Sequence, residues 1–362
     1  MKFLKNAAII MLVAILCLGC TACHPKNEVA VTVGEYEFTS GYYLCTLIFA
    51  DMEARGKVDE KLAEDKDYDA TKEVNYLKQK IDKKDFSKWV KDTAMDNLKL
   101  IANYKAECKK ADLKLDDEKT ANAEYMAEYY WSSYGYASLF EPNGVSAATF
   151  KEYMKDSYYS DLYFQHIYGA EGEKAISADD VRNTISSKFA LANILEVSFA
   201  EMQDADKTAA KDKFAAYEKE LREGKRTFEE IYKEHNQIKD EEATETTDTQ
   251  EKKPLDEYAS LIGNEDTNYA SDRFEEIAAL KVDEIKLITL EEDAGLLLVV
   301  KKDVIADPYY IESLDSDARY IIAGDGFEED MKKASDKLDT KVNDYAVDRL
   351  KVKNITYPET QA

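Results

Sequence analysis

Apolar residues recur at helical spacing through most of the chain. From residue 86 to 111, Val90, Ala94, Leu98 and Ile101 return at three- and four-residue steps with charged residues between them. This pattern predicts an amphipathic helix. Similar spacing predicts helices over 40–52, 115–134, 149–162, 210–223 and 271–280. The charged stretch 57–69 is expected to be a loop or an exposed helix, and 240–253, which has no apolar periodicity, a loop.

Pairs of capping residues mark where several of these helices begin and end. Thr149 with Glu152, Ser177 with Asp180, and Thr227 with Glu230 have the three-residue spacing of an N-terminal cap. Gly224 is placed where a helix should end. The sequence therefore predicts helix starts near 149, 177 and 227.

Alternating runs predict a few short strands. One pair is expected at 29–33 and 36–38, and a longer strand at 189–199 would place Leu191, Asn193, Leu195 and Val197 on one face. A hairpin is expected from 285–290 and 296–300. From residue 176 the order is strand, helix, helix, loop, helix, strand, strand, which is an α+β unit with helices on a small antiparallel sheet. We expect an α+β fold that is mainly helical.

The first residues have the pattern of an export signal. Two lysines precede an apolar run from 7 to 18, which is short for a membrane span and typical of a signal peptide. Gly19 then precedes Cys20, as in a lipobox, so residues 1–19 are expected to be a lipoprotein signal and 20–27 a tether. Cys23, preceded by Ala22, is a second candidate, and an ordinary secretory signal is the alternative. Acyl chains of palmitate type on Cys20 would anchor the chain to a membrane.

Net charge and the few cysteines and histidines limit which ligands and macromolecules the chain is expected to bind. A net charge of −25 disfavours binding to nucleic acid or to an anionic lipid surface. Beyond the signal only Cys45 and Cys108 remain, and they could form one disulfide or stay as buried thiols. The histidines His24, His166 and His235 show no metal-ligand spacing, so neither a metal nor a cofactor is expected.

The order of these motifs resembles the PrsA-like foldase lipoproteins and the related SurA-type chaperones. The resemblance is carried by the start at Val31–Gly34, the helix with Leu98 and Ile101, the turn at Asn143–Gly144 and the stretch from Ser177 to Val197. It implies a helical chaperone-type body over 28–175, an inserted parvulin-type peptidyl-prolyl isomerase domain over 176–305, and a C-terminal helical segment over 306–358. That last segment, with Phe327, Met331, Leu338, Val342, Tyr345 and Leu350, would be a closing helix on the N-terminal body.

The same resemblance implies that the isomerase site is degenerate. Parvulins typically have a histidine in the first strand and another in the last, and Asn193 and Leu297 occupy these positions. The glycine-rich segment of the family is also missing from 240–261. Since Leu297 cannot form a hydrogen bond, we expect weak or absent isomerase activity. For Asn193 we favour a polar residue satisfied within the sheet.

Tyrosines supply the candidate peptide-binding residues. Among 25 tyrosines, a cluster runs from Tyr125 to Tyr136, and Tyr129, Tyr130, Trp131 and Tyr134 could contact unfolded segments. Because Tyr125 and Tyr129 are one helical turn apart, core packing is the favoured interpretation.

Three functions follow as hypotheses. The first is a membrane-anchored extracytoplasmic chaperone or foldase for unfolded or nascent exported polypeptides, on the outer face of the cytoplasmic membrane. The second is an active parvulin isomerase that uses substituted residues, which requires a compact pocket where Asn193, Leu297 and an acidic or hydroxyl residue converge. The third is a non-catalytic lipoprotein scaffold.

Overall fold

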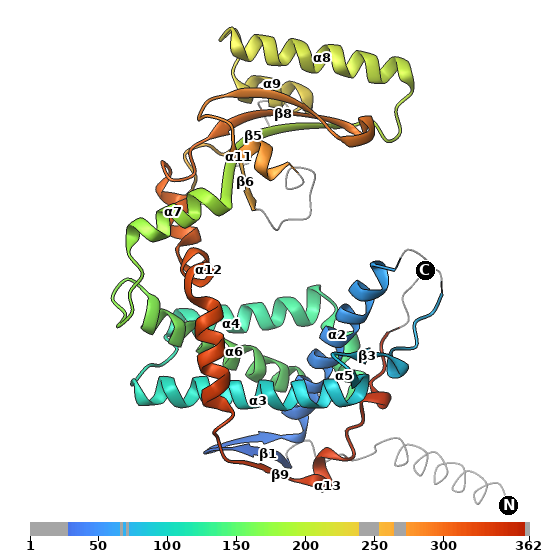
Figure 1. The fold of residues 1–362 in the computed structure, drawn as a ribbon, viewed down its shortest axis with the longest axis vertical. Coiled ribbons are helices and arrows are strands. Elements are labelled where there is room, and N and C mark those ends of the chain that lie inside the picture. The colour runs from blue at the N-terminus through green and yellow to red at the C-terminus, as the bar shows by residue number, and fades with distance from the viewer. Residues whose placement is uncertain (1–27, 66–67, 70–71, 239–252, 264–272, 359–362) are drawn as a thin grey trace, which may run out of the picture. The chain divides into compact units, whose positions relative to one another are not determined.

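The computed structural model describes residues 28–65, 68–69, 72–238, 253–263 and 273–358. The expected signal, tether, Cys20 and Cys23 lie outside the described residues, as does most of the 240–253 loop. The chain divides into two compact units, the first made of Met1–His166 with Gly326–Ala362 and the second of Ile167–Asp325. Both are drawn in Figure 1. Among the described residues, no helix combines the length and apolarity that a membrane span needs.

The first unit is helical and rests on a three-stranded sheet. Its elements are β1 (Val29–Val33), β2 (Tyr36–Thr39), α2 (Ser40–Ala63), η1 (Tyr76–Lys78), β3 (Lys80–Ile81), β4 (Lys84–Asp85), α3 (Phe86–Lys110), α4 (Asp117–Glu128), the π-helical turn η2 (Tyr129–Ser133), α5 (Tyr136–Asn143), α6 (Ala147–Tyr168), β9 (Thr340–Val342), α13 (Asp344–Val347) and η5 (Val352–Asn354). One core joins Phe38, Ile48, Leu98 and Phe140, so sheet and helices share their buried faces. The helix α2 runs eleven residues past the expected end at 52 and takes up much of the 57–69 stretch as exposed helix.

The start of α6 differs from the sequence expectation. Ser146, not Thr149, caps this helix: its Oγ accepts from the Thr149 N–H at 3.2 Å, and its carbonyl accepts from the Phe150 N–H at 3.0 Å. The pairs Thr149–Glu152 and Ser146–Thr149 both have a three-residue spacing. Ser146 lies two residues after Gly144, which turns the chain with φ +99°. The reversal of the chain at Gly144 lets the helix begin earlier.

The closing helix expected through Leu350 is wrong beyond residue 335. The helix α12 (Pro308–Ser335) ends there, and β9 pairs with β1 through Val342 and Val31. The Gly34 N–H donates to the Asp339 carbonyl and the Asn343 N–H to the Ala30 carbonyl, both at 2.8 Å. These bonds satisfy an otherwise open sheet edge, which outweighs the helical spacing of the apolar residues. The final segment, red in Figure 1, therefore returns to the first unit as a strand.

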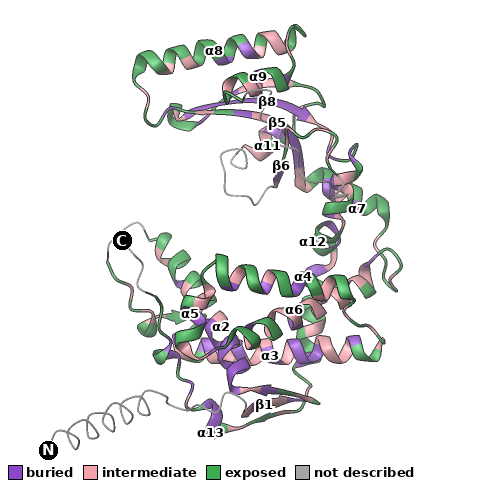
Figure 2. Ribbon diagram, turned by 180° about the vertical axis from the view of Figure 1, so that it is seen from behind, coloured by how far each residue is buried: buried purple, intermediate pink, exposed green. Residues whose placement is uncertain are grey.

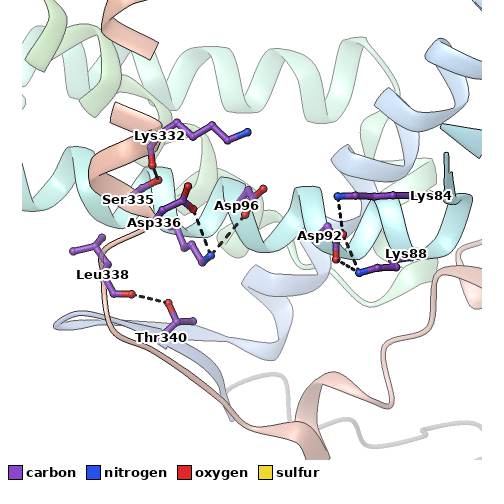
Figure 3. Close-up of polar contacts among 10 residues, drawn as sticks. Lys84, Lys88, Asp92, Asp96, Lys332, Ser335, Asp336, Leu338 and Thr340 are labelled. Atoms are coloured by element: carbon purple, nitrogen blue, oxygen red, sulfur yellow. Dashed lines mark hydrogen bonds and ion pairs between the residues drawn. The ribbon is translucent and has the colours of Figure 1, made fainter. Parts of the chain in front are cut away.

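Ion pairs between α3 and the end of α12 support this return. Lys99 of α3 lies 3.7 Å from Asp96 and 3.8 Å from Asp336. Figure 3 shows these two aspartates among neighbouring polar contacts. Phe327 packs edge-on against Phe164 at 5.1 Å between ring centroids. Aromatic contacts, more than the exposed ion pairs, hold α12 on the first unit.

The second unit is an α+β layer structure. It contains α7 (Ala178–Lys188), β5 (Phe189–Ser198), α8 (Asp204–Arg222), α9 (Phe228–His235), β6 (Ala259–Gly263), α11 (Phe274–Ala278), β7 (Ile285–Thr289), η4 (Glu291–Asp293), β8 (Gly295–Lys302) and the first part of α12. The antiparallel sheet has the order β6-β5-β8-β7. Helices α8 and α9 cover one face through Phe214 and Ile231, and α11 covers the other through Ile277. The expected hairpin of β7 and β8 is confirmed, whereas β6 was not expected.

The local signals in this unit are confirmed. Ser177 Oγ accepts from the Asp180 N–H at 3.1 Å, and Thr227 with Glu230 forms a complete capping box. Gly224 follows the end of α8 with φ +65°, a conformation that costs other residues energy. These are interactions within four residues, which is why the sequence reveals them.

Candidate functional site

Asn193 and Leu297, which the resemblance assigned to the family's histidine positions, lie on opposite faces of the sheet. In the register of β5 and β8, Asn193 is opposite Val300, and Leu297 is opposite Glu196. Cross-strand partners share a face and successive residues alternate, so a separation of three residues along β8 puts Leu297 on the face that Asn193 does not share. The pocket required by the isomerase hypothesis, in which both side chains converge, is not formed.

The Asn193 side chain links β5 to the segment that precedes β6. Its side chain is 1% exposed, and its Nδ2 donates to Asp256 Oδ1 at 3.2 Å. The same carboxylate oxygen accepts from the Tyr258 N–H at 3.0 Å. Asn193 Oδ1 has no hydrogen-bond partner among the described residues. The amide thus binds the turn that leads into β6, and only one of its two polar atoms has a partner among the described residues, so Asn193 is not the fully satisfied sheet residue that was expected.

Leu297 is an ordinary core residue. It is fully buried beneath α11 with Ile277, Ile288 and Val299. Figure 2 shows β8 coloured as buried along most of its length. Within the described parts of the chain, no three metal-ligating side chains come together either.

The tyrosine cluster is built by α4 and the turn that follows it. In η2 the Tyr134 N–H donates to the Tyr129 carbonyl at 3.1 Å, a bond spanning five residues. A π turn adds one residue to the helical period, and such turns are frequent at functional sites. Here it brings Tyr129 and Tyr134 within 5.8 Å between ring centroids.

The rings form one connected surface. Tyr125 stacks on Tyr129 at 6.5 Å, Tyr130 meets Tyr134 edge-on at 5.4 Å, and Tyr130 stacks on Tyr136 at 5.7 Å. Burial raises the pKa of Tyr136, with smaller contributions from Tyr130 and Tyr134. We call Tyr125, Tyr129, Tyr130 and Tyr134 the tyrosine face.

Three of the four rings are exposed, which corrects the core packing expected for Tyr125 and Tyr129, whereas Tyr130 is half-buried and packs against the core of the first unit. Tyr125 is 67% exposed, Tyr129 41% and Tyr134 63%. The inner side of α4 is made by Ala123 and Ala127, whose small side chains let the helix lie close to its neighbours. Tyr125 therefore occupies the outer side of α4, much of which is coloured as exposed in Figure 2, and Tyr129 and Tyr134 continue the exposed surface over η2 and its end.

Trp131 does not belong to the exposed surface. It is 9% exposed and packs against Phe150 at 5.3 Å and Phe140 at 6.4 Å. Trp131 supports the tyrosine face from within the core, because the π turn rotates it inward while its neighbours point outward. Of the four candidate residues, it is the one that cannot contact a partner directly.

Cys45 and Cys108 are free and buried, which decides between the two alternatives left by the sequence. Burial raises the pKa of the Cys45 thiol well above its usual value and that of Cys108 to about 11. Both therefore stay protonated near neutral pH and are poor nucleophiles. Neither thiol belongs to a site.

A buried charge that the sequence does not reveal holds the C-terminal segment. Asp51 is fully buried, and its Oδ2 accepts from Arg55 Nε at 2.7 Å and from the Tyr357 hydroxyl at 2.6 Å. The Arg55 guanidinium lies 4.4 Å from the Tyr76 ring and 4.1 Å from the Tyr357 ring. Asn143 binds the adjacent Thr356 backbone at both its N–H and its carbonyl. Asp51 and Tyr357 are 306 positions apart in the chain and Asn143 and Thr356 are 213 apart, so no local pattern could connect them.

Comparison with known proteins gives two solved structures of foldases. No protein-family model matches this chain, and neither does any curated protein. Foldase protein PrsA from Streptococcus pneumoniae is 13% identical, with 71% of this chain and 87% of that chain covered and a TM-score of 0.37. Foldase protein PrsA from Lactococcus lactis is 12% identical, with 72% and 87% covered and a TM-score of 0.35.

Proposed function

We propose that this protein is a chaperone that binds unfolded polypeptide through the tyrosine face. The observation that supports the proposal is the concentration of exposed rings on α4 and η2, two of them more than 60% exposed. Tyrosine buries a large apolar area while keeping a polar tip, so it can hold many different sequences loosely. Exposed aromatic rings that gather into one connected surface are typical of interaction sites.

An aggregation-suppression assay tests this proposal. The chain from Thr21 onward, which keeps every described residue, is mixed with a denatured client as it is diluted into buffer. Replacing Tyr129 and Tyr134 together by serine should raise the concentration needed for half-maximal suppression at least about thirtyfold, because each ring buries apolar area worth about 1–2 kcal/mol on binding and the two losses add to about 2–4 kcal/mol. Tyr345→Ser is the matched control, since Tyr345 is 69% exposed elsewhere in the first unit. If the original chain, the double serine variant and Tyr345→Ser suppress aggregation equally, the tyrosine face is not the binding site.

The second unit is proposed to have no isomerase activity. Prolyl isomerisation needs polar groups placed around the imide in an apolar pocket. Asn193 and Leu297 do not share a face, and the amide of Asn193 is already committed to Asp256. A protease-coupled isomerisation assay should therefore give the uncatalysed rate. Catalysis that disappears on Asn193→Ala would contradict this proposal.

The location of the protein is proposed from its first residues. We expect export and lipid attachment at Cys20, with the body on the outer face of the cytoplasmic membrane. Mass spectrometry of the protein from the membrane fraction should find an acylated N-terminal cysteine. Cys20→Ser should release the protein from that fraction, whereas Cys23→Ser should not. The opposite result would make Cys23 the anchor. If neither substitution releases the protein from the membrane fraction, the proposal of a lipid anchor is wrong.

A further inference from the structure

The tyrosine face lies in a part of the chain that has negative charge and no cations of its own. From residue 120 to 146 there is no lysine, arginine or histidine, but there are Glu124, Glu128 and Glu141, all exposed. Glu124 pairs with Lys151 of α6 at 2.9 Å. Glu128 accepts a hydrogen bond from Ser132 at 2.8 Å and meets no cation in the described chain. Within this segment every charged side chain is therefore acidic, and one of the three, Glu124, is paired with a lysine of α6.

Elsewhere the protein places its own cations over its tyrosines. A lysine or arginine lies between 4.0 and 5.9 Å from the ring centroids of Tyr36, Tyr76, Tyr159, Tyr168, Tyr217, Tyr345 and Tyr357. Among the described residues, no such contact involves the tyrosine face. Seven tyrosines outside the tyrosine face thus receive a cation from the described chain, and the four rings of the face do not.

From this contrast we infer that the tyrosine face selects cationic segments of unfolded polypeptide, those rich in arginine and lysine. The inference rests on the proposed function and specifies its substrate class. A guanidinium or ammonium group over a tyrosine ring is attracted by the negative face of the ring. Neighbouring glutamates add Coulomb attraction, and the net charge of −25 attracts basic segments from a distance. Acidic segments are repelled by the same charges.

Peptide binding measured by fluorescence anisotropy tests this inference. Three dye-labelled, unstructured peptides of equal length carry the same apolar residues and differ only in having arginine, glutamine or glutamate at the remaining positions. The arginine peptide should bind about tenfold tighter than the glutamine peptide, the equivalent of two exposed cation–π contacts. Raising the salt concentration should reduce this ratio, because the Coulomb part is screened.

A matched variant separates ring chemistry from apolar area. Replacing Tyr129 and Tyr134 together by leucine keeps apolar surface and helix propensity but removes the π faces. The variant should bind the glutamine peptide nearly as well as the original chain and lose most of the preference for arginine. Tyr345→Leu should keep the preference. Fluorescence of Trp131, which lies beneath the face, verifies that the variant remains folded.

The outcomes distinguish this inference from the proposed function. Equal binding of all three peptides by the original chain would overturn the charge preference while leaving the chaperone proposal in place. Binding of none of them, together with no suppression of aggregation, would end both. An arginine preference that is as large in the leucine variant as in the original chain at raised salt, where the Coulomb part is screened, would also overturn the inference. So would binding that weakens as the protein self-associates, because the occupant would then be a second copy of the chain.

Discussion

Removing the hydroxyl of Tyr357 tests whether a buried charge fastens the C-terminal segment to the first unit. In Tyr357→Phe the ring can stay over Arg55, at 4.1 Å in the original chain, but the bond from the hydroxyl to Asp51 is lost. Asp51 then keeps Arg55 as its hydrogen-bond partner, and its Oδ1 already has none among the described residues. The substitution therefore isolates one charge-assisted hydrogen bond.

The expected magnitude follows from the burial of the acceptor. Hydrogen bonds to charged groups contribute about 1.5–3 kcal/mol, and an acceptor left unsatisfied in the interior pays its full desolvation cost. Asp51 is fully buried. Tyr357→Phe should therefore lower the free energy of unfolding of the first unit by about 2 kcal/mol. For a domain stabilised by about 5–15 kcal/mol this is a large effect.

Denaturant unfolding followed by tryptophan fluorescence measures this loss selectively. The chain has two tryptophans, Trp89 and Trp131, and both lie in the first unit. Tyr345→Phe, at an exposed ring, is the control and should change stability by less than about 0.5 kcal/mol. In an Asp51→Leu background the loss caused by Tyr357→Phe should nearly vanish, because the acceptor is gone. A loss below about 0.5 kcal/mol in the original chain would refute the proposed role of the buried charge.

Three other predictions concern both units. Burial raises the pKa of Tyr43 and of Tyr104 to about 12, so their contribution to stability is complete below the unfolded pKa near 10 and is lost as the pH rises towards 12. At pH 11 each tyrosine should lower the free energy of unfolding by about 1.4 kcal/mol. Tryptophan fluorescence should then show unfolding at a lower denaturant concentration, and an unchanged midpoint would contradict this. A methyl group added by Gly295→Ala would overlap the Val197 carbonyl oxygen, so the second unit should lose about 1–3 kcal/mol by circular dichroism while the tryptophan signal stays the same. Thr227→Ala removes half of a capping box and should cost about 1 kcal/mol in the same measurement, with Thr227→Ser restoring it; no loss would mean that α9 is held by packing alone.

The fold was predictable where its determinants are local. The boundaries of α3, the caps at Ser177 and Thr227 and the hairpin of β7 and β8 all follow from contacts between residues close in sequence. The predicted secondary structure was wrong where a segment pairs with a strand that is distant in the sequence. At residue 342, pairing with the open edge of β1 replaces the helix that apolar spacing indicated.

The sequence predicted which residue types form the candidate site, but not which of their side chains are exposed. The sequence identified the tyrosines, yet only the structure shows that Ala123 and Ala127 form the buried side of α4 and leave the rings outside. Likewise, the register of β5 and β8 places Asn193 and Leu297 on different faces, and register depends on pairing across the sheet.

By itself the sequence determined the α+β class, most helices and strands, the local caps, the acidic charge and the tyrosine-rich segment, because periodicity and capping act over a few residues. The tertiary structure decided which face of α4 is exposed, that Trp131 is core, that Cys45 and Cys108 stay free, and that Tyr357 reaches Asp51. Each of these depends on which distant surfaces meet, and a contact between residues hundreds of positions apart leaves no periodic trace in the chain.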